Sequence, residues 1–170
     1  GKIVEEKKNQ KFGTTELTLQ NGIKVYLKKT DFKEDQILMS GTTNGGFRLY
    51  SKPSDILNTK IVDDIVSLGG LGKFDAIALG KALTGRTVSV SPAFGNFTSG
   101  FSGNSTVADF ETMLQLTYLY MTDIRADKEA FAAYKEKTTE ALKMAERQPF
   151  ASLSDSINYL LFDNDIWRKK

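Results

Sequence analysis

The chain has 170 residues, of which 40% are hydrophobic and 26% charged, and its formal net charge is +2. This length suits one globular domain with its own core, and a small net charge with scattered basic residues argues against nucleic-acid binding. The sequence has no histidine and no cysteine, which excludes Ser-His-Asp and Cys-His catalysis, the common zinc sites and disulfides. No stretch approaches the roughly 20 apolar residues that a membrane-spanning helix needs.

Residues 1–12 are polar and charged, and we expect them to form a linker or a disordered lead-in without the apolar stretch of a signal peptide. Polar and apolar residues then alternate on both sides of Asn21-Gly22. Such an arrangement predicts a β-hairpin with a type I′ turn, which needs a positive φ at both central residues. Five apolar side chains of this hairpin are predicted to cover a core: Leu17, Leu19, Ile23, Val25 and Leu27.

A third strand is predicted over residues 36–44, with Ile37 and Met39 on one side. From residue 53 the apolar residues recur at helical spacing, which predicts one helix over residues 53–68. A shorter helix is expected over residues 75–83, and a glycine follows each of these helices at a position that suits a helix end.

Two paired strands are predicted next, over residues 87–93 and 96–102. Thr106 to Asp109 resembles a capping box and opens a helix that runs to about residue 121. The apolar residues of this helix cover more than half of its circumference, so we expect it to be well buried. A long helix begins near residue 127, and Pro149 separates it from a final helix that ends at Leu161.

The strands therefore come as hairpins and not as alternating βαβ units. This order indicates an α+β domain with a mainly antiparallel sheet and helices packed on one face. We expect residues 13–170 to form this single domain, and the polar tail after its last helix is consistent with missing closing strands.

Three short motifs suggest sites, but each has a simpler interpretation. Gly69-Gly70-Leu71-Gly72 follows a helix and lacks the Gly-Lys-Ser/Thr of a phosphate loop, which predicts a helix end and a tight turn. The side chains of Asp63 and Asp64 point about 100° apart on a helix, which indicates a solvated face and not a shared metal or acid-base site. Asp163-Asn164-Asp165 lacks the glycine and the distant glutamate of a calcium loop and is interpreted as a polar tail.

The remaining candidate residues give no active site either. Asn96-Phe97-Thr98 and Asn104-Ser105-Thr106 match the glycosylation sequon, which matters only in a eukaryotic secreted protein. Ser102 and Ser105 are not part of a Ser-x-x-Lys motif. We therefore predict no catalytic and no metal-binding residue in this chain, and the sequence assigns no substrate-binding residue.

A resemblance to a known family rests on a series of short motifs in a fixed order. Leu19-Gln20-Asn21-Gly22-Ile23-Lys24-Val25 resembles the opening of domains in the pitrilysin/insulinase family of zinc metallopeptidases, and the match covers about residues 13 to 150. Further matching residues are 27–33, Gly45, Gly46, Gly70, Gly72, Phe74, 83–86, Val88, Val90, Pro92, Gly100, Gly103, Asp109, 114–116, 125–127 and Phe131.

The resemblance implies a domain from the second, non-catalytic half of a bacterial member. In this family four α+β domains of similar fold enclose a chamber, and the first domain carries the zinc motif His-x-x-Glu-His. Residues 57–64, where that motif would fall, read Leu-Asn-Thr-Lys-Ile-Val-Asp-Asp and contain neither His nor Glu. No catalytic or metal-binding residue can therefore be carried over, and zinc is expected only in the catalytic domain of the parent protein.

The leading hypothesis is a non-catalytic domain that forms part of the substrate chamber and helps to bind a peptide, with sister domains of the same polypeptide as partners. The alternative is a scaffold or interaction module from a parent that is itself catalytically inactive. A third hypothesis, an enzyme that uses carboxylates alone, needs two converging Asp or Glu side chains, and the sequence shows no such pair. The resemblance favours a periplasmic location.

Overall fold

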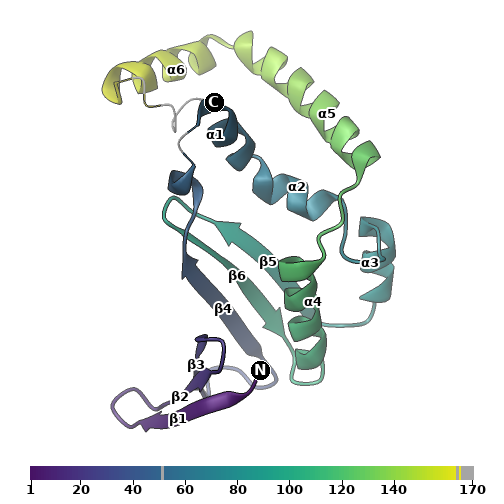
Figure 1. Ribbon diagram of the computed structural model, residues 1–170. Coiled ribbons are helices and arrows are strands. Elements are labelled where there is room, and N and C mark those ends of the chain that lie inside the picture. Colours follow the sequence, from purple (N-terminus) through teal and green to yellow (C-terminus); the bar gives the residue numbers. More distant parts are fainter. Residues whose placement is uncertain (51, 164, 166–170) are drawn as a thin grey trace. The chain divides into compact units, whose positions relative to one another are not determined.

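The computed structural model describes residues 1–50, 52–163 and 165 (Figure 1). The chain divides into two compact units, Gly1–Gln36 and Ile37–Lys170. Each unit contains one three-stranded antiparallel sheet, and the described helices all lie in the second unit. This architecture confirms the predicted α+β class with antiparallel strands.

The first unit is a sheet of β1 (Ile3–Asn9), β2 (Thr14–Leu19) and β3 (Lys24–Lys28), in that order. The strand β1 lies within residues 1–12, which we expected to be a linker or disordered. Its charged residues pair with residues of β2, as Lys7 does with Glu16. Charged side chains are typical of edge strands, and because the strand has no alternating apolar pattern, the sequence did not reveal it.

The turn between β2 and β3 differs from the predicted type I′ turn. Gly22 has a φ of 86°, but Asn21 is not among the residues with positive φ. The amide of Gly22 donates to the carbonyl of Leu19 at 2.8 Å, and the amide of Leu19 donates to the carbonyl of Ile23 at 2.8 Å. This pattern is a three-residue loop, in which a type I turn is followed by a glycine in the left-handed region.

The apolar side chains of the first unit do not form a buried core. Leu17 lies opposite Val25 in the register, and both are half-buried. Ile23 and Leu27 are 48% and 51% exposed. The predicted core-facing role is therefore not seen among residues 1–36, because this unit has no helix that could cover its sheet.

The sheet of the second unit has the order β4-β6-β5, with β4 (Ile37–Asn44), β5 (Val88–Phe94) and β6 (Thr98–Ser105). The predicted hairpin is confirmed by β5 and β6, which pair in antiparallel register. A side chain at Gly103 of β6 would come within 2.9 Å of the Met113 sulfur and 3.1 Å of the Met39 methyl carbon. The glycine thus allows the helix that carries Met113 to lie close to the sheet.

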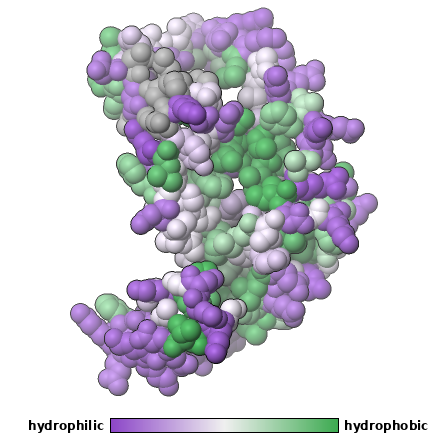
Figure 2. Space-filling model, viewed as in Figure 1, coloured by the Kyte–Doolittle hydropathy of each residue, from purple (hydrophilic) through white to green (hydrophobic). Residues whose placement is uncertain are grey.

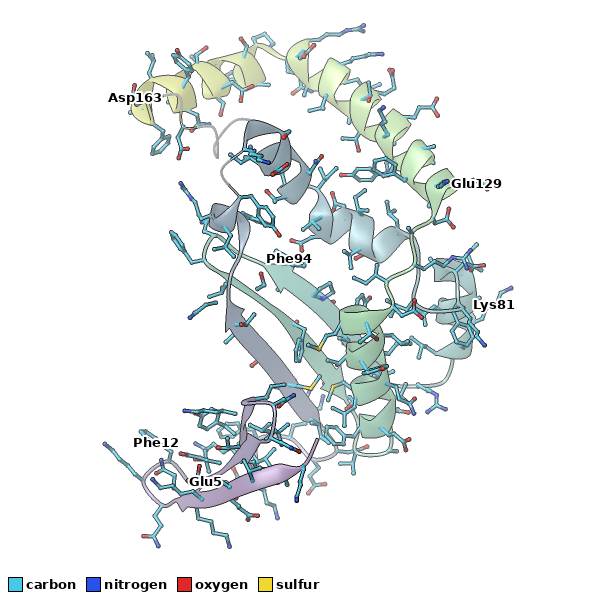
Figure 3. All side chains as sticks on the ribbon, viewed as in Figure 1. Glu5, Phe12, Lys81, Phe94, Glu129 and Asp163 are labelled. Atoms are coloured by element: carbon cyan, nitrogen blue, oxygen red, sulfur yellow. The ribbon has the colours of Figure 1, made fainter. Side chains whose placement is uncertain are left out.

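The described residues of the second unit also form a short 3-10 helix, η1 (Phe47–Leu49), and six α-helices. The ring of Phe47 stacks on that of Phe94, whose place at the end of β5 is labelled in Figure 3, with centroids 6.5 Å apart. The helix α4 contacts β5 and β6, and α2 contacts β5. The helices are α1 (Pro53–Thr59), α2 (Val62–Leu68), α3 (Ala76–Ala82), α4 (Phe110–Thr122), α5 (Lys128–Glu146) and α6 (Pro149–Leu161).

The predicted single helix over residues 53–68 is wrong, because α1 ends at Thr59 and α2 begins at Val62. The Thr59 hydroxyl donates to the carbonyl of Ile56 at 2.7 Å, and the amide of Ile61 donates to Asn58 at 3.3 Å. Ile56 on α1 and Val66 on α2 are both buried, with exposures of 1% and 8%.

The core of the second unit lies between the sheet and α4. Leu71, Val90, Met113 and Leu116 form it, and Ile37 and Met39 pack against it from β4. The predicted side of that strand is thus confirmed. The prediction that the fourth helix would be well buried holds for one face only, since Leu114, Tyr118 and Met121 are 44%, 65% and 67% exposed.

Candidate functional site

Residues 57–64, where the family resemblance would place a zinc motif, cover the end of α1, the break and the start of α2. Its two carboxylates, Asp63 and Asp64, lie in the first turn of α2, where a helix favours negative charge. Among the residues that the structure describes, no group of three or more His, Cys, Asp or Glu side chains could hold a metal ion.

The two carboxylates have separate surroundings. Asp64 accepts a hydrogen bond from the Tyr134 hydroxyl at 2.7 Å, which connects α2 to α5. This bond to Asp64, more than burial, raises the pKa of the Tyr134 hydroxyl. Partial burial, and then the charge of Asp64, raise the pKa of Asp63. Asp64 thus contributes to the packing of α2 against α5.

In the turn formed by Gly69-Gly70-Leu71-Gly72, backbone amides donate hydrogen bonds to other parts of the protein. The amide of Leu71 donates to Phe74 and the amide of Gly72 donates to Asp123, both at 2.9 Å. Gly70 has a φ of 86°, and Leu71 is only 1% exposed. Because these two amides already donate to carbonyl oxygens, the loop does not present them to a phosphate, and the tight turn that the sequence predicts is confirmed.

A polar cluster around Asp109 joins the loop before β5 to the start of α4. One Asp109 oxygen, Oδ2, accepts from the Thr87 amide at 2.9 Å and from the Thr106 hydroxyl at 3.0 Å. The other, Oδ1, lies 3.4 Å from a guanidinium nitrogen of Arg86. The Thr87 amide, the Thr106 hydroxyl and Arg86 together lower the pKa of Asp109.

Half of the predicted capping box is present in this cluster, since the Asp109 amide donates to the Thr106 hydroxyl at 3.2 Å. The carboxylate of Asp109 turns to the Thr87 amide instead of to the Thr106 amide. The cluster is thus a structural joint that the sequence indicated only in part, because Arg86 and Thr87 are distant from Asp109 along the chain.

The structure separates the remaining candidate residues. Ser105 is 1% exposed, and its hydroxyl has no hydrogen-bond partner among the described atoms, so it is closed to a substrate. Ser102 is exposed on β6. Of the two sequon asparagines, Asn96 is exposed in the turn before β6 and Asn104 lies within that strand. Asn164 lies outside the described residues, and Asp165 pairs with Arg48 at 3.6 Å.

Two grooves of the second unit are lined largely by apolar side chains. A groove of about 350 Å³ lies between α2 and the start of α5, lined by Ile65, Leu68, Ile124 and Phe131 among others. Figure 2 shows a hydrophobic patch over α2. A larger groove of about 710 Å³ lies between α5 and α6. Charged side chains also line both grooves, Asp127 and Lys128 in the first and Glu146 and Asp155 in the second.

Comparison with known proteins gives the chain a set of relatives. It is 28% identical over 168 residues to a protein of Arabidopsis thaliana described as a zinc protease PQQL-like. The aligned region covers 98% of this chain and 15% of the relative. No known family profile matches the chain.

Three solved structures share the fold. A mutant of the ferredoxin protease FusC in complex with Arabidopsis ferredoxin matches with a TM-score of 0.84 and 14% identity, over 100% of this chain and 19% of that one. The periplasmic protease PqqL from Escherichia coli matches with a TM-score of 0.77 and 18% identity, over 94% and 17% of the two chains. A protease from Helicobacter pylori gives a TM-score of 0.62 and 13% identity, over 86% and 35%.

These matches confirm the resemblance that the sequence motifs indicated. The chain is similar to a domain of the pitrilysin-family zinc proteases and has the fold of their domains. It spans less than a fifth of the curated relative and of the first two solved structures. No described helix is long and apolar enough to cross a membrane.

Proposed function

We propose that this chain, a relative of pitrilysin-family zinc proteases, is a non-catalytic domain that forms part of the substrate chamber of its parent protein and assists peptide binding. One observation carries the proposal: the chain aligns with a zinc protease over 98% of its length and contains no histidine or cysteine. A zinc protease that includes such a domain needs its metal ligands elsewhere.

The proposed role follows from what the domain offers to a substrate. It has apolar grooves and a sheet with two outer strands, β4 and β5, in the second unit. An outer strand can hold an extended peptide through backbone hydrogen bonds without reading its sequence. The parent protein would supply zinc and the general base from a sister domain.

The finer assignments rest on the relatives. We propose a place in the second half of the parent, because residues 57–64 lack the zinc motif at its expected position. The relative from Escherichia coli is a periplasmic protease, which supports a bacterial, periplasmic parent. The curated relative is from a plant, so the bacterial origin stays a prediction.

The test is to measure bound zinc and peptide hydrolysis for the 170-residue chain and for the full-length polypeptide side by side. We expect zinc and hydrolysis only in the full-length protein. A second experiment adds an extended peptide to the full-length protein and monitors hydrogen exchange of β4 and β5. Unchanged exchange in both strands would contradict the peptide-binding role.

The second candidate function is a scaffold in a parent without activity. The lack of histidine and cysteine in this chain favours it as well, because a domain without metal ligands could also belong to a parent whose other half has lost its zinc motif. A full-length polypeptide that binds no zinc and cuts no peptide, and whose upstream sequence has no His-x-x-Glu-His, would establish this alternative.

A further inference from the structure

The sheet of the first unit has two outer strands, β1 and β3, which each pair with β2 on one side only. Figure 1 shows β1 along one edge of this sheet. Every residue of β1 except Asn9 is exposed. The outer side of such a strand presents a row of backbone amides and carbonyls to which another strand can pair.

The hydrogen bonds around β2 show which backbone groups of β1 point outward. The amide of Gln20 donates toward β1, to the carbonyl of Lys2 at 2.8 Å. Successive residues of a strand direct their backbone groups to opposite sides, so the even-numbered residues of β2 also face β1. The residues of β1 that lie opposite them include Glu5 and Lys7, which therefore bond to β2.

Glu6 and Lys8 alternate with those residues, and their amides and carbonyls therefore point away from β2. Residues of this kind must fill the hydrogen-bonded positions if a second strand pairs with the outer side of β1. In antiparallel pairing with another β1, Glu6 of one copy can lie opposite Lys8 of the other. The two-fold symmetry repeats this pair, and the opposite charges stabilise the pairing at both positions.

We propose that β1 pairs in this antiparallel register with β1 of a second copy of the chain, which joins two three-stranded sheets into one six-stranded sheet. Residues 5–8 read Glu-Glu-Lys-Lys, so the acidic half of each strand meets the basic half of the other. Lys7 lies at the two-fold axis, beside its own counterpart. Its charge is offset by Glu16, which lies opposite Lys7 within the same copy.

A shift of this register by two residues is disfavoured by charge. It would place Glu6 opposite its own counterpart at the axis, and like charges directly opposite each other destabilise a strand pair. A shift by one residue would put outward-pointing backbone groups opposite groups that already bond to β2. The charges and the backbone therefore favour the same register.

The other edge of the sheet indicates a closed dimer and not an open chain of copies. The outer strand β3 carries Lys24 and Lys28 and has no acidic residue. Pairing of β3 with another β3 would bring lysines together without carboxylates, which protects this edge. One self-complementary edge per copy gives a two-fold dimer. Because a seven-residue strand makes a small interface, the dimer should dissociate on dilution.

The first test reverses single charges in the 170-residue chain and measures its mass by sedimentation equilibrium over a concentration series. Glu6→Lys and Lys8→Glu each place like charges opposite each other at two positions. Each should raise the dissociation constant of the dimer at least about tenfold. The matched controls are Glu34→Lys and Lys33→Glu, at exposed residues after β3, which change the net charge equally and should leave the dissociation constant unchanged.

A mixture of the two β1 variants restores the charge pattern. When one copy carries Glu6→Lys and the other carries Lys8→Glu, opposite charges face each other at both positions. The mixture should therefore form a heterodimer about as tightly as the unmodified chain dimerises, although each variant alone dimerises weakly. A mixture that associates no better than its two components contradicts the register.

A single cysteine tests the same register independently, because the chain has no cysteine of its own. The two Cα atoms of a non-hydrogen-bonded antiparallel pair lie about 4.5 Å apart, within the range for a disulfide. Lys7→Cys should therefore form a disulfide-linked dimer under mild oxidation. Glu5→Cys should not, because the two introduced thiols would be separated by four residues, roughly 14 Å along the strand.

Three outcomes overturn the proposal. The first is an unmodified chain that stays monomeric up to about 1 mM. The second is equal cross-linking of Lys7→Cys and Glu5→Cys, which would show random collision. The third is a dimer whose dissociation constant is the same in Glu6→Lys and Lys8→Glu as in the unmodified chain, which would place the contact on another surface.

Discussion

Gly69 controls how closely the end of α2 approaches the chain before α5. A Cβ atom at this position would collide with the carbonyl oxygen of Arg125. We expect Gly69→Ala to lower the free energy of unfolding by about 1–3 kcal/mol, because a carbonyl of the main chain cannot move aside easily.

The matched control is Gly80→Ala within α3, where a Cβ atom would meet nothing within 4 Å. This change should stabilise the protein by about 0.5–1 kcal/mol, since alanine favours a helix more than glycine does. Urea denaturation of the two variants and of the unmodified protein measures both changes in the free energy of unfolding. Equal effects of the two substitutions would show that the close approach at Gly69 does not matter.

Asp109 is predicted to make the stability of the folded protein depend on pH in the acidic range. Hydrogen bonds from the Thr87 amide and the Thr106 hydroxyl, with the nearby Arg86, lower its pKa below the usual 3.8. A carboxylate whose folded-state pKa is lowered stabilises the protein above the unfolded-state value, and this contribution is lost as the pH falls through the folded-state value.

Asp109→Asn should therefore lower Tm at pH 7, and the difference from the unmodified protein should shrink as the pH falls below about 4. Thermal unfolding between pH 7 and pH 2.5 measures this. Two proteins whose Tm values stay the same distance apart over the whole range would contradict the role of the Asp109 charge.

At the scale of the element, α4 has a buried face and an exposed face that are both apolar. Met113 is 0% exposed and Met121 is 67% exposed on the same helix. We expect Met113→Ala to cost about 2–5 kcal/mol of stability, because it leaves a cavity beside Val90 and Leu116. Met121→Ala should change the stability by less than about 0.5 kcal/mol.

Chemical denaturation of both variants checks this prediction. A loss at Met121 as large as that at Met113 would mean that the exposed face of α4 packs against something in solution. The two methionines thus also measure whether the helix is covered on its outer side.

At the scale of the whole molecule, most elements could be predicted because their apolar periods are plain. The period-2 pattern around Val88 and Val90 gave β5, and the helical spacing from Phe131 onward gave α5. What was missed had no such signal. The charged strand β1 is held by pairing with β2. The helical spacing of apolar residues continues across the break between α1 and α2, so the spacing did not indicate that break.

The exposed faces of α4 and α6 show a related limit. Their apolar residues look like core residues in the sequence, and the periodicity cannot tell whether the covering partner lies within the chain. The sequence predicted the lack of a zinc site mainly from its missing residue types, because a chain without histidine or cysteine has few ways to hold zinc. The polar joint at Asp109 needed the fold, which brings Arg86 and Thr87 to the start of α4.

The lack of histidine and cysteine leads to a prediction about zinc and the stability of the whole chain. A ligand that binds the folded state raises stability by RT ln(1 + [L]/Kd), so a specific zinc site would shift Tm when zinc is added or removed. The chain has no histidine or cysteine, and no cluster of ligands occurs among its described residues. We expect thermal unfolding of the 170-residue chain to be the same with excess zinc and with a chelator. In the full-length polypeptide the chelator should lower Tm and abolish hydrolysis, because zinc would be held by the sister domain. A zinc-dependent Tm in the 170-residue chain alone would place a metal site in this domain and contradict its supporting role.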